Sequence, residues 1–463
     1  MKGKIGQGRL WASQLTLEAL AQVIGREQIE GCLARTGRQS VRVRKLPAAG
    51  VVWLVIGIGL FAEGDLPTIW RQVVGTLARL WQVAAGVKAA GKSAIAAARR
   101  RLGARVMRLL FRAVSAPVAD DQTRGAFYRG HRLMAIDGQK LCVPDTPANA
   151  RAFGRPSTRR YGQAVGGGYP QLLLMRLIET GTHVAVEALI KPCRQGEYPL
   201  AGALLRQAPR GALVLQDRGF YGYCQIQQAM RQGVHLLGRV GAHVVFEHVR
   251  SLDDGSSLVC IYPTLKDRRH RRRGLIVRLI RYTLDDPDRP GHRQEHRLIA
   301  TLLDDKTYPA AELVELYHQR WEIEIDNDEL ATHQINRPVE LRSRTPAGVV
   351  QELYGILLAH NAVRMLMHES ARRLNLDPRS LSFIHAVRVI RETIPLMRAA
   401  PVAQLPCLYQ AMLTHIAQGR LPPRENRINP RVVKVKMSNY AKKQPGDRGT
   451  WVKPFSHAII MLK

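Results

Sequence analysis

Hydrophobic and polar residues follow two different patterns along the chain. From Leu66 to Ala119 the apolar residues recur at helical spacing, which predicts two or more amphipathic helices. Between residues 130 and 300 they gather in short runs separated by glycine, proline and aspartate, and such runs predict strands. Helical spacing returns after Pro309. The order predicts a mixed α/β fold with helices before and after the strands.

The region rich in strands is itself divided. Five of the apolar runs fall between residues 234 and 303, with no pattern of helical length between them. We therefore predict a β-rich subdomain inserted into an α/β core. The predicted parts are a helical basic DNA-binding domain (1–125), the first part of the core (126–233), the insertion (234–305), the second part of the core (306–375) and a helical, basic C-terminal region (376–463).

The net charge of the chain indicates what kind of molecule it binds. The 463 residues carry 70 Lys and Arg against 37 Asp and Glu, a formal net charge of +33, and 46% of them are hydrophobic, which excludes general disorder. Such an excess on a folded protein indicates a polyanionic partner, with nucleic acid the leading candidate. The stretch 66–119 holds ten basic residues and no acidic one, so we predict DNA contacts there by Arg99, Arg100 and Arg101.

Two further basic blocks lie outside the helical region. Residues 266–273 read KDRRHRRR and predict DNA contacts by Arg271, Arg272 and Arg273, and residues 420–453 carry ten basic residues against two acidic ones. A solubilising loop or a disordered tail explains either block taken alone. Three separate basic blocks around one acidic centre favour double-stranded DNA as the partner.

Several protein classes are excluded. The six cysteines form no C-x-x-C pair and show no zinc-site spacing, which indicates reduced thiols in a cytosolic protein. The longest apolar run, residues 48–62, is too short to span a bilayer and lies too far along the chain for a signal peptide. We expect no membrane partner.

Acidic residues follow two of the predicted strands. Asp137 comes after RLMAI and Asp217 after ALVLQ, so we expect each at the carboxyl end of a buried strand, where open α/β sheets place reactive groups. The alternatives are a hairpin turn at Asp137 and a strand-to-helix turn at Asp217. A third acid, Glu324, follows Tyr317 and Arg320 at spacings that put all three on one face of a single predicted helix. A helix-surface ion pair is its alternative.

Three carboxylates from two strands and a helix can hold two Mg²⁺ ions, since Mg²⁺ prefers oxygen ligands. Paired ions stabilise the attacking and the leaving oxygen during in-line phosphoryl displacement. With a positive surface to bind DNA, this arrangement predicts an enzyme that cleaves phosphodiester bonds.

Several segments resemble a known family. Tyr317-x-x-Arg320-x-x-x-Glu324 resembles the Tyr-Arg-Glu-Lys signature of the DDE transposases of bacterial insertion sequences, insertion sequence four family. AIDGQKLCVPDTPANARAFG and LVLQDRGFYGY resemble the blocks around its first and second catalytic aspartates. TGRQSVRVRKLPAAGVVWLVIGIGLF and NPRVVKVKMSNY are also similar to it, so the resemblance spans most of the chain in the expected order. It implies a ribonuclease H-like core with a β-strand insertion.

The resemblance assigns roles to five residues. It implies that Asp137, Asp217 and Glu324 are the catalytic triad and bind two Mg²⁺ ions, for which Mn²⁺ can substitute. It also implies that Tyr317 and Arg320 contact phosphate near the transposon end. The function implied is cut-and-paste transposition: hydrolysis at terminal inverted repeats and 3′-OH strand transfer into target DNA, by at least a dimer at the bacterial nucleoid.

One signature position departs from the pattern. The lysine falls at Ala331, so a phosphate contact is missing or is replaced by His333 or Arg337. This leaves open a catalytically impaired, transposase-derived DNA-binding protein, although the three acids argue against it. A ribonuclease H-like nuclease or resolvase without strand transfer is the other alternative, and a tyrosine recombinase is a remote one.

Aromatic residues bear on a hairpin intermediate. Relatives that form DNA hairpins stack a flipped base on an aromatic side chain of the insertion, often tryptophan, but no tryptophan lies within 234–303. Phe246, Tyr262 or Tyr282 would have to stack the base instead. We predict core packing for Trp321.

Overall fold

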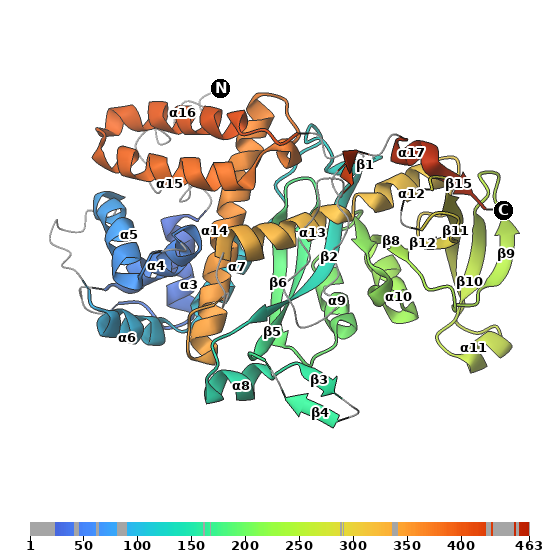
Figure 1. Ribbon diagram of the computed structural model, residues 1–463, viewed down its shortest axis with the longest axis horizontal. Coiled ribbons are helices and arrows are strands. Elements are labelled where there is room, and N and C mark those ends of the chain that lie inside the picture. The colour runs from blue at the N-terminus through green and yellow to red at the C-terminus, as the bar shows by residue number, and fades with distance from the viewer. Residues whose placement is uncertain are drawn as a thin grey trace, which may run out of the picture. The chain divides into compact units, whose positions relative to one another are not determined.

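The computed structural model describes residues 24–40, 46–61, 64–80, 90–160, 163–166, 168–287, 289, 291–335, 341–422, 427–428, 449–450 and 453–462. The chain divides into two compact units. The first comprises Met1–Ala208 and Trp321–Arg420, and the second comprises Pro209–Arg320 and Leu421–Lys463. Figure 1 labels the elements of both.

The first unit begins with helices, as the spacing predicts for residues 66–119. They are α3 (Arg26–Arg35), α4 (Ala48–Leu60), α5 (Leu66–Leu80), α6 (Lys92–Leu102) and α7 (Ala104–Val114). Helix α4 is the predicted apolar run, and eleven of its thirteen residues are buried. It packs against the long helix α14 (Pro346–Arg373), which Figure 1 shows crossing the unit. No described helix is long and apolar enough to cross a membrane.

The sheet of the first unit is antiparallel. Its order is β6 (Val184–Pro192), β5 (Gln171–Glu179), β2 (His131–Cys142), with β1 (Phe127–Tyr128) paired to β2. Strand β5 is buried at eight of nine positions because helices cover the sheet. The unit also contains α8 (Pro147–Phe153), the hairpin of β3 (Ser157–Arg160) and β4 (Gln163–Gly166), and α9 (Glu197–Leu205).

Asp137 does not end a strand. It is paired with Arg176 in the middle of β2, whose residues continue to pair with β5 as far as Cys142. The predicted strand end and the alternative hairpin turn are both wrong at this position. The cause is that the polar residues after Asp137 keep their ladder hydrogen bonds while their side chains are half-buried or exposed.

The remainder of the first unit is helical. Helix α13 (Trp321–Asp328) runs into a π-helix, η3 (Glu329–Ile335), before α14. After α14 come η4 (Pro378–Ser380), α15 (Phe383–Ala399), η5 (Val402–Gln404) and α16 (Leu405–Gln418), and α15 packs along α16.

The second unit starts with a βαβ unit. Strands β7 (Leu213–Gln216) and β8 (His235–Arg239) are parallel, and η2 (Arg218–Phe220) and α10 (Tyr223–Gln232) lie between them in sequence. The sheet continues from β8 through β12 (His296–Ala300), β11 (Leu275–Leu284) and β10 (Ser257–Ile261) to β9 (Glu247–Ser251), all antiparallel. The five predicted strands are thus confirmed, with the short helix α11 (Leu265–Arg269) between two of them.

The second unit is completed by α12 (Ala310–His318), the short strands β13 (Arg427–Ile428) and β14 (Gly449–Thr450), α17 (Phe455–Ala458) and β15 (Ile459–Met461), which pairs with β11. The predicted single helix through Tyr317, Arg320 and Glu324 is wrong. It is broken at residues 319–320, where the backbone N–H of Arg320 bonds to the carbonyl of Tyr317 at 3.0 Å and closes α12. Helical spacing therefore does not place Glu324 on the same helix face as Tyr317 and Arg320.

Some predicted segments lie outside the described residues. They are Arg337, the whole segment NPRVVKVKMSNY (429–440), most of the basic block 420–453, and residues 41–45 of the N-terminal segment that resembles the family. The side chain of His333 also lies outside the description.

Candidate active site

Asp137 and the helix of Glu324 meet in the first unit. The side-chain amide of Asn327 on α13 donates a hydrogen bond from Nδ2 to Oδ2 of Asp137, 2.8 Å away. Glu324 precedes Asn327 by three residues, so about 60° separates the two side chains around the helix axis. The helix face that carries Glu324 is therefore the face turned toward β2. Both acids are half-buried.

Asp217 lies in the second unit, directly after β7 as predicted. It is exposed, and its Oδ1 accepts a hydrogen bond from the backbone N–H of Arg218 at 2.7 Å, which caps η2. Tyr317 and Arg320 belong to the same unit. The pKa of Tyr317 is raised to about 12, mainly by burial; the positive charge of Arg320 opposes the rise and the negative charge of Asp217 adds to it. Asp217 and Arg320 thus both lie within electrostatic reach of the Tyr317 hydroxyl.

The donor chemistry of the three acids fits a divalent cation. Asp137, Asp217 and Glu324 offer carboxylate oxygens, the ligands that Mg²⁺ and Mn²⁺ prefer. The Asp137 carboxylate accepts the hydrogen bond from the Asn327 amide. A hydrogen bond from an uncharged amide orients a carboxylate oxygen, as groups behind a metal ligand do.

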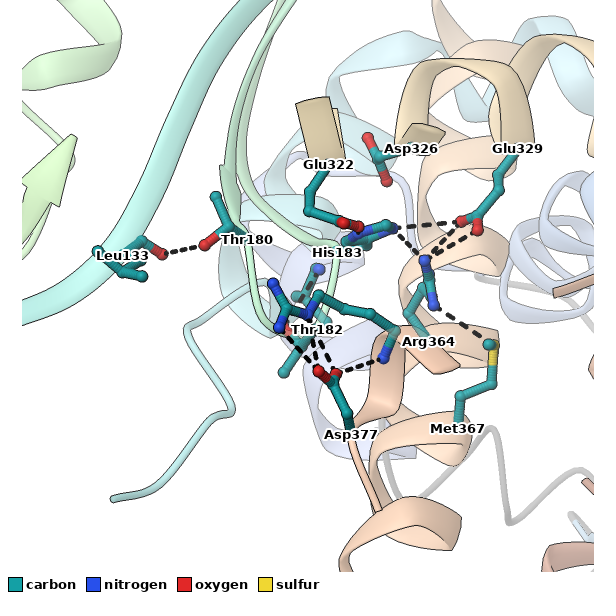
Figure 2. Close-up of polar contacts among 12 residues, drawn as sticks. Leu133, Thr180, Thr182, His183, Glu322, Asp326, Glu329, Arg364, Met367 and Asp377 are labelled. Atoms are coloured by element: carbon teal, nitrogen blue, oxygen red, sulfur yellow. Dashed lines mark hydrogen bonds and ion pairs between the residues drawn. The ribbon is translucent and has the colours of Figure 1, made fainter. Parts of the chain in front are cut away.

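A buried charged cluster lies on another face of α13, and the sequence analysis missed it. In Figure 2 the ring of His183 lies between Glu322 and Glu329. Its Nε2 is 3.0 Å from Oε2 of Glu322, and its Nδ1 is 3.6 Å from Oε2 of Glu329. Arg364 on α14 contacts the same ring and pairs with Glu329 at 2.8 Å. Ion pairs therefore attach α13 and η3 to α14.

The cluster extends to the sheet. The guanidinium of Arg176 on β5 pairs with Oδ2 of Asp326 at 2.7 Å, and both side chains are almost fully buried. His360 on α14 places Nε2 at 3.5 Å from Oδ1 of Asp326 and 3.6 Å from Oε2 of Glu329. We call these seven residues the charged cluster: Arg176, His183, Glu322, Asp326, Glu329, His360 and Arg364.

The charges within the cluster shift the pKa values of its members. Burial and the Arg364 charge lower the pKa of His183, but hydrogen bonds to Glu322 and Glu329 outweigh them and raise it above its usual range. Burial raises the pKa of Glu329, but the Arg364 charge and the two histidines hold it well below its usual range. Burial lowers the pKa of His360 and favours its neutral form. The cluster thus combines three acidic side chains with two guanidiniums and two imidazoles in one buried network.

The charged cluster contains a geometric candidate for a metal site. Ligand atoms of His183, Asp326 and Glu329 lie within 4.8 Å of one another, and all three residues are buried. However, Arg176 and Arg364 already contact the two carboxylates and supply the positive charge that an ion would bring. The arrangement is therefore that of an internal ion-pair network, and none of the three acids predicted from the sequence belongs to it.

The arginines predicted to contact DNA differ in whether their side chains are bonded within the protein or exposed to solvent. Arg99 donates to Oε1 of Gln351 at 2.8 Å and to Oγ of Ser343 at 2.9 Å, so its guanidinium bonds to the beginning of α14 and the loop before it. Arg100 and Arg101 are exposed. The structure therefore favours Arg100 and Arg101 over Arg99 for binding phosphate.

The basic block of the second unit is at the surface. Arg271, Arg272 and Arg273 are exposed. Arg273 donates both Nε and Nη2 to the Asp267 carboxylate, at 3.1 and 2.8 Å, and Arg271 lies 3.3 Å from Glu247. These pairs hold the guanidiniums at the surface, where exposed ion pairs are weak enough to be exchanged for phosphate.

The aromatic predictions are partly corrected. Trp321 is 48% exposed, so the prediction of core packing is wrong. Tyr282 is buried at 7% exposure against His296 and cannot receive a base. Phe246 packs edge-on against Tyr221 and Tyr262 donates to Glu247, and both remain half-buried. Ala331, at the position of the signature lysine, is half-buried in η3.

Comparison with known proteins finds relatives over nearly the whole chain. The family described as "Insertion element 4 transposase N-terminal" matches residues 14–112, and the family described as "Transposase DDE domain" matches residues 128–362. The transposase InsG for insertion sequence element IS4 of Escherichia coli (strain K12) is 30% identical over 433 residues, which cover 92% of this chain and 93% of InsG.

A similarity in three dimensions is weaker. A piggyBac transposase synaptic complex with hairpin DNA, solved by cryo-electron microscopy, aligns with a TM-score of 0.38 and 12% identity, over 88% of this chain and 85% of that chain.

Proposed function

Because this chain belongs to the insertion element 4 family of DDE transposases, we propose that it moves an insertion sequence by cut-and-paste transposition. The enzyme hydrolyses the phosphodiester bond at each terminal inverted repeat, and the freed 3′-OH then attacks target DNA. The observation that carries the proposal is the DDE-domain match over residues 128–362, a range that contains all three predicted acids and the contact between β2 and α13.

The proposed catalytic acids are Asp137, Asp217 and Glu324. They would hold two divalent cations, Mg²⁺ or Mn²⁺ in its place, which stabilise charge on the attacking and leaving oxygens when bound. Arg320 would donate charge-assisted hydrogen bonds to a phosphate near the cleaved end. With its pKa raised to about 12, Tyr317 keeps its proton at neutral pH. It would donate a hydrogen bond to phosphate in the proposed reaction.

DNA would be held along the positive surface. In the first unit, helices α6 and α7 contain no acidic residue. They carry five exposed arginines: Arg100, Arg101, Arg105, Arg108 and Arg112. In the second unit, the exposed residues 271–273 extend the possible contacts. Since both ends of the element must be joined, we propose at least a dimer in the DNA complex, acting on the chromosome in the bacterial nucleoid.

The test is cleavage of linear DNA carrying the ends of the flanking element. Asp137→Ala, Asp217→Ala and Glu324→Ala should each abolish nicking in Mg²⁺ while binding to the ends largely survives, because the acids serve the chemical step. Asp145→Ala is the control, since its carboxylate pairs with Arg155 at the surface. Retained nicking in any of the three variants would remove that acid from the site, and nicking without joined products would favour a nuclease.

Ala331 favours a second candidate function, that of a catalytically impaired DNA-binding protein. Restoring the signature residue with Ala331→Lys should strengthen binding to a terminal-repeat duplex, because it adds one phosphate contact. Equilibrium binding at several salt concentrations measures this. Absence of nicking in the unmodified chain and its appearance in Ala331→Lys would establish the impaired form.

A further inference from the structure

We propose that Asn327 and Arg176 are positioning residues that set the orientation of the Asp137 carboxylate for cation binding. The inference rests on the proposed function of Asp137. It concerns two residues that are not themselves signature positions, one on α13 and one on β5, and neither is a proposed ligand.

Arg176 is the cross-strand partner of Asp137 in the pairing of β2 with β5. Its guanidinium reaches across to α13, where Nη1 pairs with Oδ2 of Asp326 at 2.7 Å and Nη2 donates to Oδ1 of Asn327 at 2.5 Å. The side chain is 1% exposed. A buried arginine with a planar fork fixes both partners in direction as well as in distance.

This contact determines which way the Asn327 amide points. A guanidinium can only donate, so the amide oxygen must face Arg176 and the amide NH₂ must face Asp137. The NH₂ group then makes the 2.8 Å hydrogen bond to Oδ2 of the carboxylate. Gln139, two residues beyond Asp137 on β2, donates to the backbone carbonyl of Asn327 at 3.3 Å. The side-chain amide is thus held at both its oxygen and its nitrogen, and the backbone of Asn327 is held by Gln139.

The consequence is that one oxygen of the Asp137 carboxylate, Oδ2, is held in place relative to α13. Because Glu324 lies one helical turn before Asn327, the same contact fixes the approach of two proposed cation ligands from different elements. Groups that orient a metal ligand in this way contribute about 10- to 100-fold to metal affinity or activity. A merely structural Asn327 would contribute to folding alone.

The experiment uses the full chain and compares Asn327→Ala with Asn149→Ala. Asn149 is a buried asparagine of the same unit, whose amide donates to the carbonyls of Pro144 and Ser343. Mn²⁺ binding is measured directly by electron paramagnetic resonance without DNA, alongside thermal unfolding and the Mn²⁺ dependence of nicking. We expect Asn327→Ala to weaken Mn²⁺ binding by about 10- to 100-fold. Asn149→Ala should lower the unfolding temperature and leave Mn²⁺ affinity unchanged.

Arg176→Lys tests the second residue and does not depend on the folding of Asn327→Ala. It keeps a positive charge beside Asp326 but loses the fork, so we expect a smaller loss of Mn²⁺ affinity in the same direction. The double variant should bind Mn²⁺ no more weakly than Asn327→Ala alone, since both act through one amide. Additive losses would remove Arg176 from the proposal.

Asp137→Ala separates this inference from the proposed function. If Asp137→Ala binds Mn²⁺ and nicks DNA like the unmodified chain, the assignment of Asp137 fails. If Asp137→Ala loses both while Asn327→Ala and Arg176→Lys retain full Mn²⁺ affinity, the function stands and the positioning role is overturned.

Discussion

Two segments of the first unit are joined to α14 by opposite means: α4 by apolar packing, and α13 with η3 by charged side chains. Helix α4 is apolar throughout and lies close to α14, where a Cβ added at Gly355 would come within 2.4 Å of the Val55 carbonyl oxygen. Helix α13 reads WEIEIDND, and with η3 it is attached to α14 through the charged cluster. Shape complementarity determines how near a helix lies, whereas ion pairs also fix its rotation. The helix that presents Glu324 has the attachment that controls rotation.

The largest loss of unfolding free energy should come from breaking the ion pair between Arg364 on α14 and Glu329 on η3. Arg364→Leu leaves Glu329 buried beside two histidines without its cation, which should cost about 3–5 kcal/mol of unfolding free energy. Chemical denaturation measures this, with Arg373→Leu as control. Arg373 pairs with Glu369 on the same helix but at the surface, so its loss should cost less than about 1 kcal/mol. Equal losses in the two variants would contradict the distinction between the helices.

A smaller effect should come from disturbing the shape of the α4 contact. Gly355→Ala forces α4 and α14 apart, because the new methyl group meets backbone rather than a movable side-chain tip, and should cost about 1–3 kcal/mol. Gly31→Ala in α3 is the matched control, since its added Cβ meets nothing within 4 Å. Denaturation of both variants gives the difference. Mn²⁺ affinity should stay unchanged in Gly355→Ala, and a change would mean that α4 also influences the site.

The smallest effect should be a pH dependence of the unfolding free energy that comes from the charged cluster. The raised pKa of His183 contributes stability that is present below its usual value of 6.5 and is lost as pH rises through the folded-state pKa. The lowered pKa of Glu329 contributes stability that is present above 4.5 and is lost as pH falls through its folded-state value. Unfolding measured across pH should therefore show a loss above about 6.5 that His183→Gln removes. The same alkaline loss in His183→Gln would assign it to another group.

Much of the fold could be predicted because apolar periodicity reports burial directly. The helices over residues 66–119, the strands from β5 to β12 and the mixed α/β class follow from that pattern, and the family resemblance is confirmed by the matches to both described families. The predicted domain boundaries and the roles of the three acids stay predictions. Asp217 is found directly after β7 as expected, because the buried run before it ends where polar residues begin.

The remainder depended on tertiary contacts that leave little local signal. The break at residues 319–320 contains neither glycine nor proline, so helical spacing continues through it in the sequence. The polar residues after Asp137 predict a turn, yet β5 continues to pair with them as far as Cys142. One usable signal was overlooked: Arg176 interrupts an otherwise apolar strand, and His360 and Arg364 interrupt a buried helix. A charged residue in such a run indicates a buried partner.

The buried ion pairs of the cluster also constrain how this sequence can diverge. Losing any one charged member leaves a partner ion inside the protein without compensation, so single substitutions there pass through a poorly folded intermediate. Lineages descended from this chain should therefore keep these positions unchanged or replace opposite charges together. Substitutions at the seven positions of the charged cluster would then be correlated among related sequences, although the positions do not form one short motif.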